Sequence, residues 1–130
     1  MELRAYSDAD HGSDPIDRKS VTRFCIFLGD FLISWKSKKQ SIVSQSSTEV
    51  EYRSMTSTTK EIVWLRWLLA NMGVFFSHPT PMYCDNQSSI QIAHNSVFHE
   101  RTKHIEIYCH LTCHHLKHGT IALPFVPFSL

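Results

Sequence analysis

Three acidic residues lie at positions where a carboxylate is expected to have a chemical role. Asp8 closes the alternating segment 3–8 and Asp85 closes the segment 81–85, and each follows a Tyr by two residues, which places Asp and Tyr on the same face of a strand. Glu51 extends the apolar stripe of an expected helix. A carboxylate buried at that position must be paired, protonated or bound to a cation, because burying it alone is costly.

The chemistry that these residues could support together is metal binding. Open α/β sheets place their ligands at the carboxyl ends of neighbouring parallel strands, so we expect Asp8, Glu51 and Asp85 to converge there. Three carboxylates repel one another unless a divalent cation neutralises them, and hard oxygen ligands suit Mg²⁺ or Mn²⁺. A lone Asp at a strand end is more often a turn or cap residue, but the combination of three favours a metal site.

The element that must position Glu51 is a long helix expected from Ser46 to Gly73. Ser46 with Glu49 three residues later forms a capping-box pattern, which is a sufficient role for Glu49, and Gly73 is a natural helix stop. An apolar stripe recurs along this segment at alternating spacings of three and four residues. Its members are Met55, Thr58, Ile62, Leu65, Leu69 and Met72.

The rest of the chain predicts a mixed sheet. Further strands are expected at 21–28, 31–38, 81–85 and 121–126, and further helices at 87–95 and 102–118. The turn at Gly29-Asp30 predicts a hairpin between the second and third strands. The order β-β-β-α-β-α-α-β indicates an α/β fold, with an antiparallel meander followed by strands that the helical crossovers make parallel.

Composition sets broad limits on the class of protein. With 130 residues and 42% hydrophobic content, the chain is expected to form one globular domain with its own core. The net charge of +1 indicates no partner class by itself. No signal peptide or long apolar run is present and the four cysteines lack disulfide-framework spacing, so we expect an intracellular protein with reduced thiols and no membrane contact.

A zinc site is a weaker alternative for the last expected helix. Cys109 and Cys113 are one helical turn apart and have histidines nearby, so they could share an ion. No second ligand pair at a typical spacing follows, and Cys is frequently a buried residue. The simpler interpretation is therefore that these cysteines belong to the core.

The chain resembles the RNase H domain of copia-type retrotransposon Pol polyproteins, most closely the plant ones. The blocks that carry the resemblance cover almost the whole chain in the right order. They are YSDADHGSDPIDRKS (6–20), LISWKSKKQ (32–40), VSQSSTEVEYRSM (43–55), WLRWLL (64–69), PMYCDNQSSIQIAHN (81–95), FHERTKHIEI (98–107) and LPFVP (123–127). The resemblance implies an RNase H-like fold over residues 1–130, with a five-stranded mixed sheet flanked by helices.

The resemblance also implies an activity, which is metal-dependent hydrolysis of the RNA strand of RNA–DNA hybrids during reverse transcription. The family's metal ligands fall on Asp8, Glu51 and Asp85, and they imply two Mg²⁺ ions, with Mn²⁺ as an alternative. The implied partners are the hybrid and the reverse transcriptase domain of the same polyprotein. The implied location is cytoplasmic, in a virus-like particle.

Contacts to the hybrid are expected from polar and basic residues around this site. Phosphate contacts position a duplex without reading its sequence, and the 2′-hydroxyl distinguishes RNA from DNA. His104 recurs in the family motif and could take part in the chemistry, although a favourable charge at a helix start explains it equally well. The expected nucleic-acid contacts are Ser46, Asn86, Lys36, Lys38, Lys39, Arg101, Lys103 and His104.

The chain also departs from the family pattern. The family carries a fourth acidic ligand in a Leu-Ala-Asp segment after the last strand, and here the sequence ends at Leu130, so we expect a truncated domain without its C-terminal helix. Arg23 stands where Gly is usual and His11 where Trp is usual. Two alternatives to an active enzyme therefore stay open: a weakened or inactive remnant that only binds nucleic acid, and a remnant without a stable fold.

Overall fold

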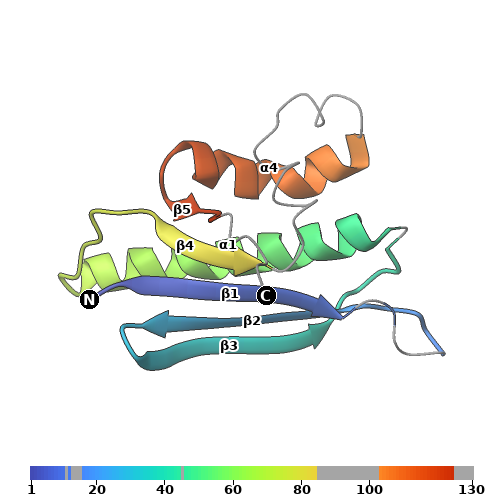
Figure 1. The fold of residues 1–130 in the computed structure, drawn as a ribbon, viewed down its shortest axis with the longest axis horizontal. Coiled ribbons are helices and arrows are strands. Elements are labelled where there is room, and N and C mark those ends of the chain that lie inside the picture. Colours follow the sequence, from blue (N-terminus) through green and yellow to red (C-terminus); the bar gives the residue numbers. More distant parts are fainter. Residues whose placement is uncertain (11, 13–15, 45, 85–102, 125–130) are drawn as a thin grey trace, which may run out of the picture.

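The computed structural model contains one five-stranded sheet with strand order β3-β2-β1-β4-β5 (Figure 1). The structure describes residues 1–10, 12, 16–44, 46–84 and 103–124, with the backbone alone for 103–109. The strands are β1 (Leu3–Asp10), β2 (Val21–Leu28), β3 (Phe31–Lys39), β4 (Thr80–Cys84) and β5 (Ile121–Ala122), and the described helices are α1 (Ser47–Asn71) and α4 (Lys103–Lys117). The expected helix at 87–95 lies outside the described residues.

Strand directions agree with the expected mixed sheet. β1, β2 and β3 pair antiparallel as a meander, and Gly29, with φ +60°, provides the left-handed turn between the last two. β4 runs parallel to β1, with Ala5 opposite Met82 and Ser7 opposite Cys84. β5 runs parallel to β4, with Thr80 opposite Ile121. The hairpin and the two parallel pairings that the sequence predicts are therefore confirmed.

Helix α1 begins and ends as its sequence predicts. Ser46 is the N-cap, and its Oγ accepts a hydrogen bond from the N–H of Glu49 over 3.1 Å. Gly73 follows the helix with φ +89°, a conformation that favours glycine. The apolar stripe is buried at Met55 and Ile62, but Met72 is 71% exposed. The prediction that the stripe extends to Met72 is therefore wrong.

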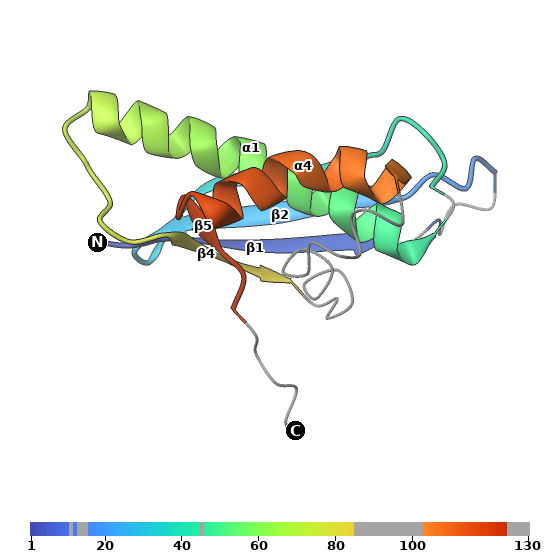
Figure 2. The same ribbon diagram turned by 90° about the horizontal axis from the view of Figure 1, so that it is seen from above.

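Both described helices lie on one face of the sheet (Figure 2). The core lies between that face and α1, and α4 with β5 closes one side of it. It is formed by Leu3, Ala5, Phe24, Ile26, Tyr52, Met55, Ile62, Leu65, Met82, Cys113, Ile121 and Leu123. Full burial raises the pKa of the Tyr52 phenol, which keeps it neutral in the core. No described helix is long and apolar enough to span a membrane.

Two expectations need correction in the described part of the chain. β1 continues to Asp10, two residues beyond the expected segment 3–8, because antiparallel pairing with β2 extends to the end of the strand. The carboxylate of Asp10 pairs with Arg23 of β2 over 2.8 Å. Cys25 and Cys84 form no disulfide, but Cys113 takes part in one, so the expectation of reduced thiols is wrong for Cys113.

Candidate metal centre and nucleic-acid surfaces

Asp8 lies near the carboxyl end of β1, on the face of the sheet opposite α1. Its side chain is exposed, and its Oδ1 accepts a hydrogen bond from the N–H of Ala9 over 2.8 Å. Tyr6, two residues earlier, is 42% exposed and stacks on Tyr83 of β4, whereas Ser7 between them is buried. The alternation that places Asp8 and Tyr6 on one face is therefore present.

Glu51 occupies the sheet-facing side of α1 and is only 4% exposed. Two contacts fix this helix against β1: Ser54 Oγ donates to the carbonyl oxygen of Asp8 over 2.7 Å, and Thr58 Oγ1 donates to Ser7 Oγ over 3.0 Å. Later residues of α1 thus meet earlier residues of β1, and the two elements run in opposite directions. Glu51, one turn before Ser54, accordingly lies at the carboxyl end of β1, as the stripe predicts.

The third expected ligand, Asp85, lies outside the described residues. The last described residue of β4 is Cys84, which pairs with Ser7 in the parallel register. Within the described ranges, no group of three or more His, Cys, Asp or Glu side chains is placed to hold a metal ion. The convergence of Asp8, Glu51 and Asp85 therefore stays a prediction, of which the structure places two members.

The two described carboxylates have donor chemistry that fits a hard divalent cation. Both offer oxygen atoms, and no basic side chain of the described residues forms an ion pair with Asp8, since Arg23, across the strand pair, binds Asp10 instead. Glu51 is held on a helix and screened from water, whereas Asp8 is open to solvent. The structure thus places both carboxylates at the carboxyl end of β1 but on different faces of the strand, and a cation shared between them stays a prediction.

Ser46 is part of the lining of a shallow hollow of about 310 Å³ at the start of α1. Its hydroxyl is used as the helix cap, and the rest of the lining comes from the connection between β1 and β2, the segment before α1 and the first turn of α1. Gly12 is part of this lining, and its N–H donates to Ser20 Oγ over 2.9 Å. The remaining expected contacts cannot be placed here: Asn86 and Arg101 lie outside the described residues, and the side chains of Lys103 and His104 are not described.

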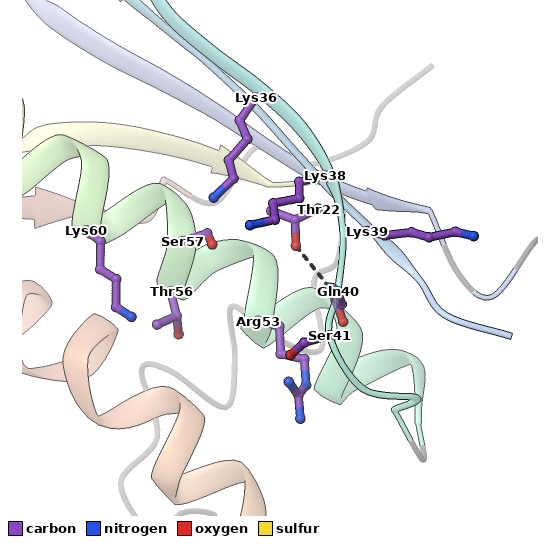
Figure 3. A pocket seen from close by; sticks show the side chains of 10 residues that line it. All are labelled: Thr22, Lys36, Lys38, Lys39, Gln40, Ser41, Arg53, Thr56, Ser57 and Lys60. Atoms are coloured by element: carbon purple, nitrogen blue, oxygen red, sulfur yellow. Dashed lines mark hydrogen bonds between the residues drawn. The ribbon is translucent and has the colours of Figure 1, made fainter. Parts of the chain in front are cut away.

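The clustered lysines of β3 divide between the two faces of the strand (Figure 3). Lys36 and Lys38 extend toward α1 and line a cleft of about 350 Å³. Lys39 extends away, and its Nζ lies 2.6 Å from Asp17 Oδ2. Sequence reasoning missed Arg53 and Lys60, which line the same cleft from α1. Arg53 and Lys60 are seven residues apart, which is two helical turns, so the sequence could have placed them on one face of α1. Nothing in the sequence could have placed that face next to β3.

The zinc alternative loses one of its ligands. Cys113 is buried and takes part in a disulfide, so its sulfur is not a free thiolate. Its neighbour His114, which is exposed on α4, has its ring 4.3 Å from that of His118, which is exposed just after the end of the helix. The buried part of this segment is core, in agreement with the simpler interpretation of the cysteine.

The chain is similar in sequence to Pol polyproteins of plant transposons. No protein-family model matches the chain. It is 41% identical over 97% of its length to the retrovirus-related Pol polyprotein from transposon RE2 of Arabidopsis thaliana, and 40% identical over 97% to that from transposon RE1 of the same plant. It is 42% identical over 83% of its length to the Pol polyprotein from transposon TNT 1-94 of Nicotiana tabacum. The chain spans 8–9% of the length of these relatives.

Solved structures with the same fold are RNase H domains. RNase H1 from Halobacterium salinarum matches with a TM-score of 0.66 at 12% identity, covering 98% of this chain and 87% of that one. The N-terminal RNase H domain of a Mycobacterium tuberculosis protein matches with a TM-score of 0.62 at 11% identity, covering 95% and 87% respectively. At such low identity the likeness establishes the fold, which agrees with the mixed sheet predicted from the sequence.

Proposed function

The chain belongs with the retrovirus-related Pol polyproteins of plant transposons and has an RNase H fold, and on that premise we propose that it is a ribonuclease H acting on the RNA strand of RNA–DNA hybrids. The proposal rests on the position of Glu51, which is buried next to the end of β1. Asp8 is exposed at that same end of the strand. The carboxylate oxygens that Asp8 and Glu51 offer at this end of the strand are ligands that suit a hard divalent cation.

Asp8, Glu51 and Asp85 would hold Mg²⁺, or Mn²⁺ in its place. When bound, a pair of such ions activates a water molecule and stabilises the leaving oxygen of a phosphodiester. Ser54 and Thr58 hydrogen-bond α1 to β1, which positions the start of the helix that carries Glu51 against the end of the strand that carries Asp8. Because Asp8 is open to solvent, a phosphate can reach the centre from outside without a change in the fold.

The first experiment measures cleavage of a labelled RNA–DNA hybrid with Mg²⁺ or Mn²⁺ and compares the variants Asp8→Asn and Asp10→Asn. The two substitutions remove the same charge from the same face of β1, but Asp10 is paired with Arg23 at the protein surface. We expect Asp8→Asn to lower the rate at least about 100-fold and Asp10→Asn to keep it within about threefold. Equal loss in both variants, or no cleavage by a folded wild-type chain, would contradict the proposal.

A second candidate is the binding remnant, favoured by the two departures from the family pattern at His11 and Arg23. It predicts that the chain binds a hybrid without cutting it. Circular dichroism tests the remaining possibility, since a broad, non-cooperative melt would indicate a chain without a stable fold.

The biological setting follows from the relatives and is likewise a proposal. Since the chain spans about a tenth of each Pol polyprotein, we propose that it works beside the reverse transcriptase domain of the same polyprotein, in cytoplasmic virus-like particles. Co-purification of the two parts from particles would support this arrangement, and recovery of the chain outside the particle fraction would oppose it.

A further inference from the structure

The cleft between α1 and β3 gathers positive charge that the candidate metal centre does not use. We call it the α1–β3 cleft and define it by Lys36 and Lys38 of β3 and Arg53 and Lys60 of α1 (Figure 3). Its volume is about 350 Å³, and hydroxyl groups, including that of Ser57, complete its lining. Lys39 also borders the hollow, but its ammonium group pairs with Asp17. In a chain whose net charge is only +1, five cationic residues around one hollow are a local concentration of charge.

Most of this charge is not neutralised within the described part of the protein. Arg53 pairs with Glu49 over 3.2 Å, but no described carboxylate forms an ion pair with Lys36, Lys38 or Lys60. Glu61, next to Lys60 on α1, accepts a hydrogen bond from Ser34 instead. The three lysines are therefore available to an anion from solution.

The α1–β3 cleft is distinct from the metal centre but joined to it through α1. At about 100° per residue, Arg53 points roughly 200° away from Glu51, so the two lie on opposite sides of the helix. Gln40 connects the regions: its Nε2 donates to Thr22 Oγ1 at one end of the cleft and to the carbonyl oxygen of Val50, the residue before Glu51.

The length of the charged surface suits a polymeric anion. From Arg53 to Lys60, α1 rises about 10 Å, which is the axial length of about three nucleotides of a strand at 3.4 Å each. No aromatic side chain is among the described residues that line the cleft, so it offers nothing on which a base could stack. Its chemistry is that of contacts to phosphates, which do not depend on sequence.

We propose that the α1–β3 cleft binds the phosphodiester backbone of nucleic acid outside the segment being cut, through Lys36, Lys38 and Lys60. This inference rests on the proposed function for its choice of ligand, because the same helix carries Glu51. The cleft holds a flanking strand and thereby raises the affinity for longer hybrids without touching the reacting phosphate. An acidic protein segment is the competing ligand, and the experiment includes it.

The test compares two double variants of the full chain. Lys38→Gln/Lys60→Gln removes two charges from the cleft, and Lys19→Gln/Lys117→Gln removes two lysines outside it. Binding of a fluorescent 18-base-pair RNA–DNA hybrid is measured by anisotropy in EDTA, over a series of salt concentrations, so that neither cleavage nor metal contributes. Thermal unfolding followed by circular dichroism verifies that both double variants fold. If Lys38→Gln/Lys60→Gln does not fold, the single variant Lys60→Gln replaces it in the binding measurement.

We expect the cleft variant to bind the long hybrid about tenfold more weakly at low salt, and the slope of log K against log salt to fall by about 2. The control variant should stay within about twofold of the wild type. A 6-base-pair hybrid, too short to span both sites, should show a smaller difference between the variants.

The outcomes separate this inference from the proposed function. If the wild type cleaves the hybrid but the cleft and control variants bind it equally, the inference is wrong and the enzyme proposal stands. If the wild type does not cleave but the cleft variant still loses affinity, the inference stands alone. If poly-glutamate of matched charge displaces the hybrid as well as unlabelled hybrid does, the cleft is a general polyanion site and the nucleic-acid assignment is overturned.

Discussion

Ser54 Oγ donates a hydrogen bond to the carbonyl oxygen of Asp8 over 2.7 Å. This contact joins the helix that carries one candidate ligand to the strand that carries another, and Ser54 is fully buried. It lies three residues after Glu51, so it sets the position of the first turns of α1 relative to the end of β1. The geometry of the candidate centre thus depends on a residue that is not itself a ligand.

Replacing Ser54 by Ala should lower both stability and activity. The substitution leaves the Asp8 carbonyl without this donor, and we expect a loss of about 1–2 kcal/mol in the free energy of unfolding, measured with urea. Because α1 is then less firmly placed, the cleavage rate should fall about tenfold with little change in KM. Ser37→Ala, on the exposed side of β3, is the matched control and should change neither quantity. Normal turnover by Ser54→Ala would show that the contact is only structural.

Metal binding should stabilise the fold through the two described carboxylates. A ligand that binds only the native state adds about 1.4 kcal/mol to the free energy of unfolding when its free concentration is ten times Kd. Urea denaturation with and without Mg²⁺, at constant ionic strength, should show this gain for the wild type and for Asp10→Asn. Asp8→Asn should show none. A gain that survives in Asp8→Asn would place the cation elsewhere.

Two methionines of one helical stripe should differ sharply in their contribution to stability. Met55 is 0% exposed in the core and Met72 is 71% exposed at the end of α1. We expect Met55→Ala to cost about 2–5 kcal/mol, because it leaves a cavity, and Met72→Ala to cost less than about 0.5 kcal/mol. Chemical denaturation of both variants measures the difference. Similar losses would mean that the end of α1 is covered in solution.

His115 should make the protein less stable in mild acid. Burial, and then the charges of His114 and His118, lower the pKa of His115 below its usual value near 6.5. The unfolded chain then binds more protons than the folded one as the pH falls below about 6.5, so the contribution of this residue to stability is present above that pH and is lost below it. Comparing urea midpoints at pH 7.5 and pH 5.5 measures the effect.

The variant His115→Gln isolates that contribution. It should be less sensitive to pH than the wild type over the same interval, while His78→Gln, in the exposed connection before β4, should behave like the wild type. The buried Nδ1 of His115 has no hydrogen-bond partner among the described residues, so Gln is not expected to break a bond that they make there. An unchanged pH dependence in His115→Gln would assign the effect to other groups.

Sequence alone determined most of the local structure of this protein. The cap at Ser46, the stop at Gly73 and the turn at Gly29 are recognised from a few neighbouring residues, because capping and turn geometry depend on the adjacent backbone. The burial of Glu51 also followed from sequence, since helical periodicity states which residues share a face.

Only the tertiary structure decided where these elements end relative to one another. Met72 follows the stripe but is exposed, and Asp10 follows the predicted strand end but is paired with Arg23 across the sheet. Lys36 and Lys60 belong to different elements, and no local pattern relates them. They share a cleft because α1 packs beside the edge strand β3, and such non-local packing depends on the volumes and contacts of the whole core.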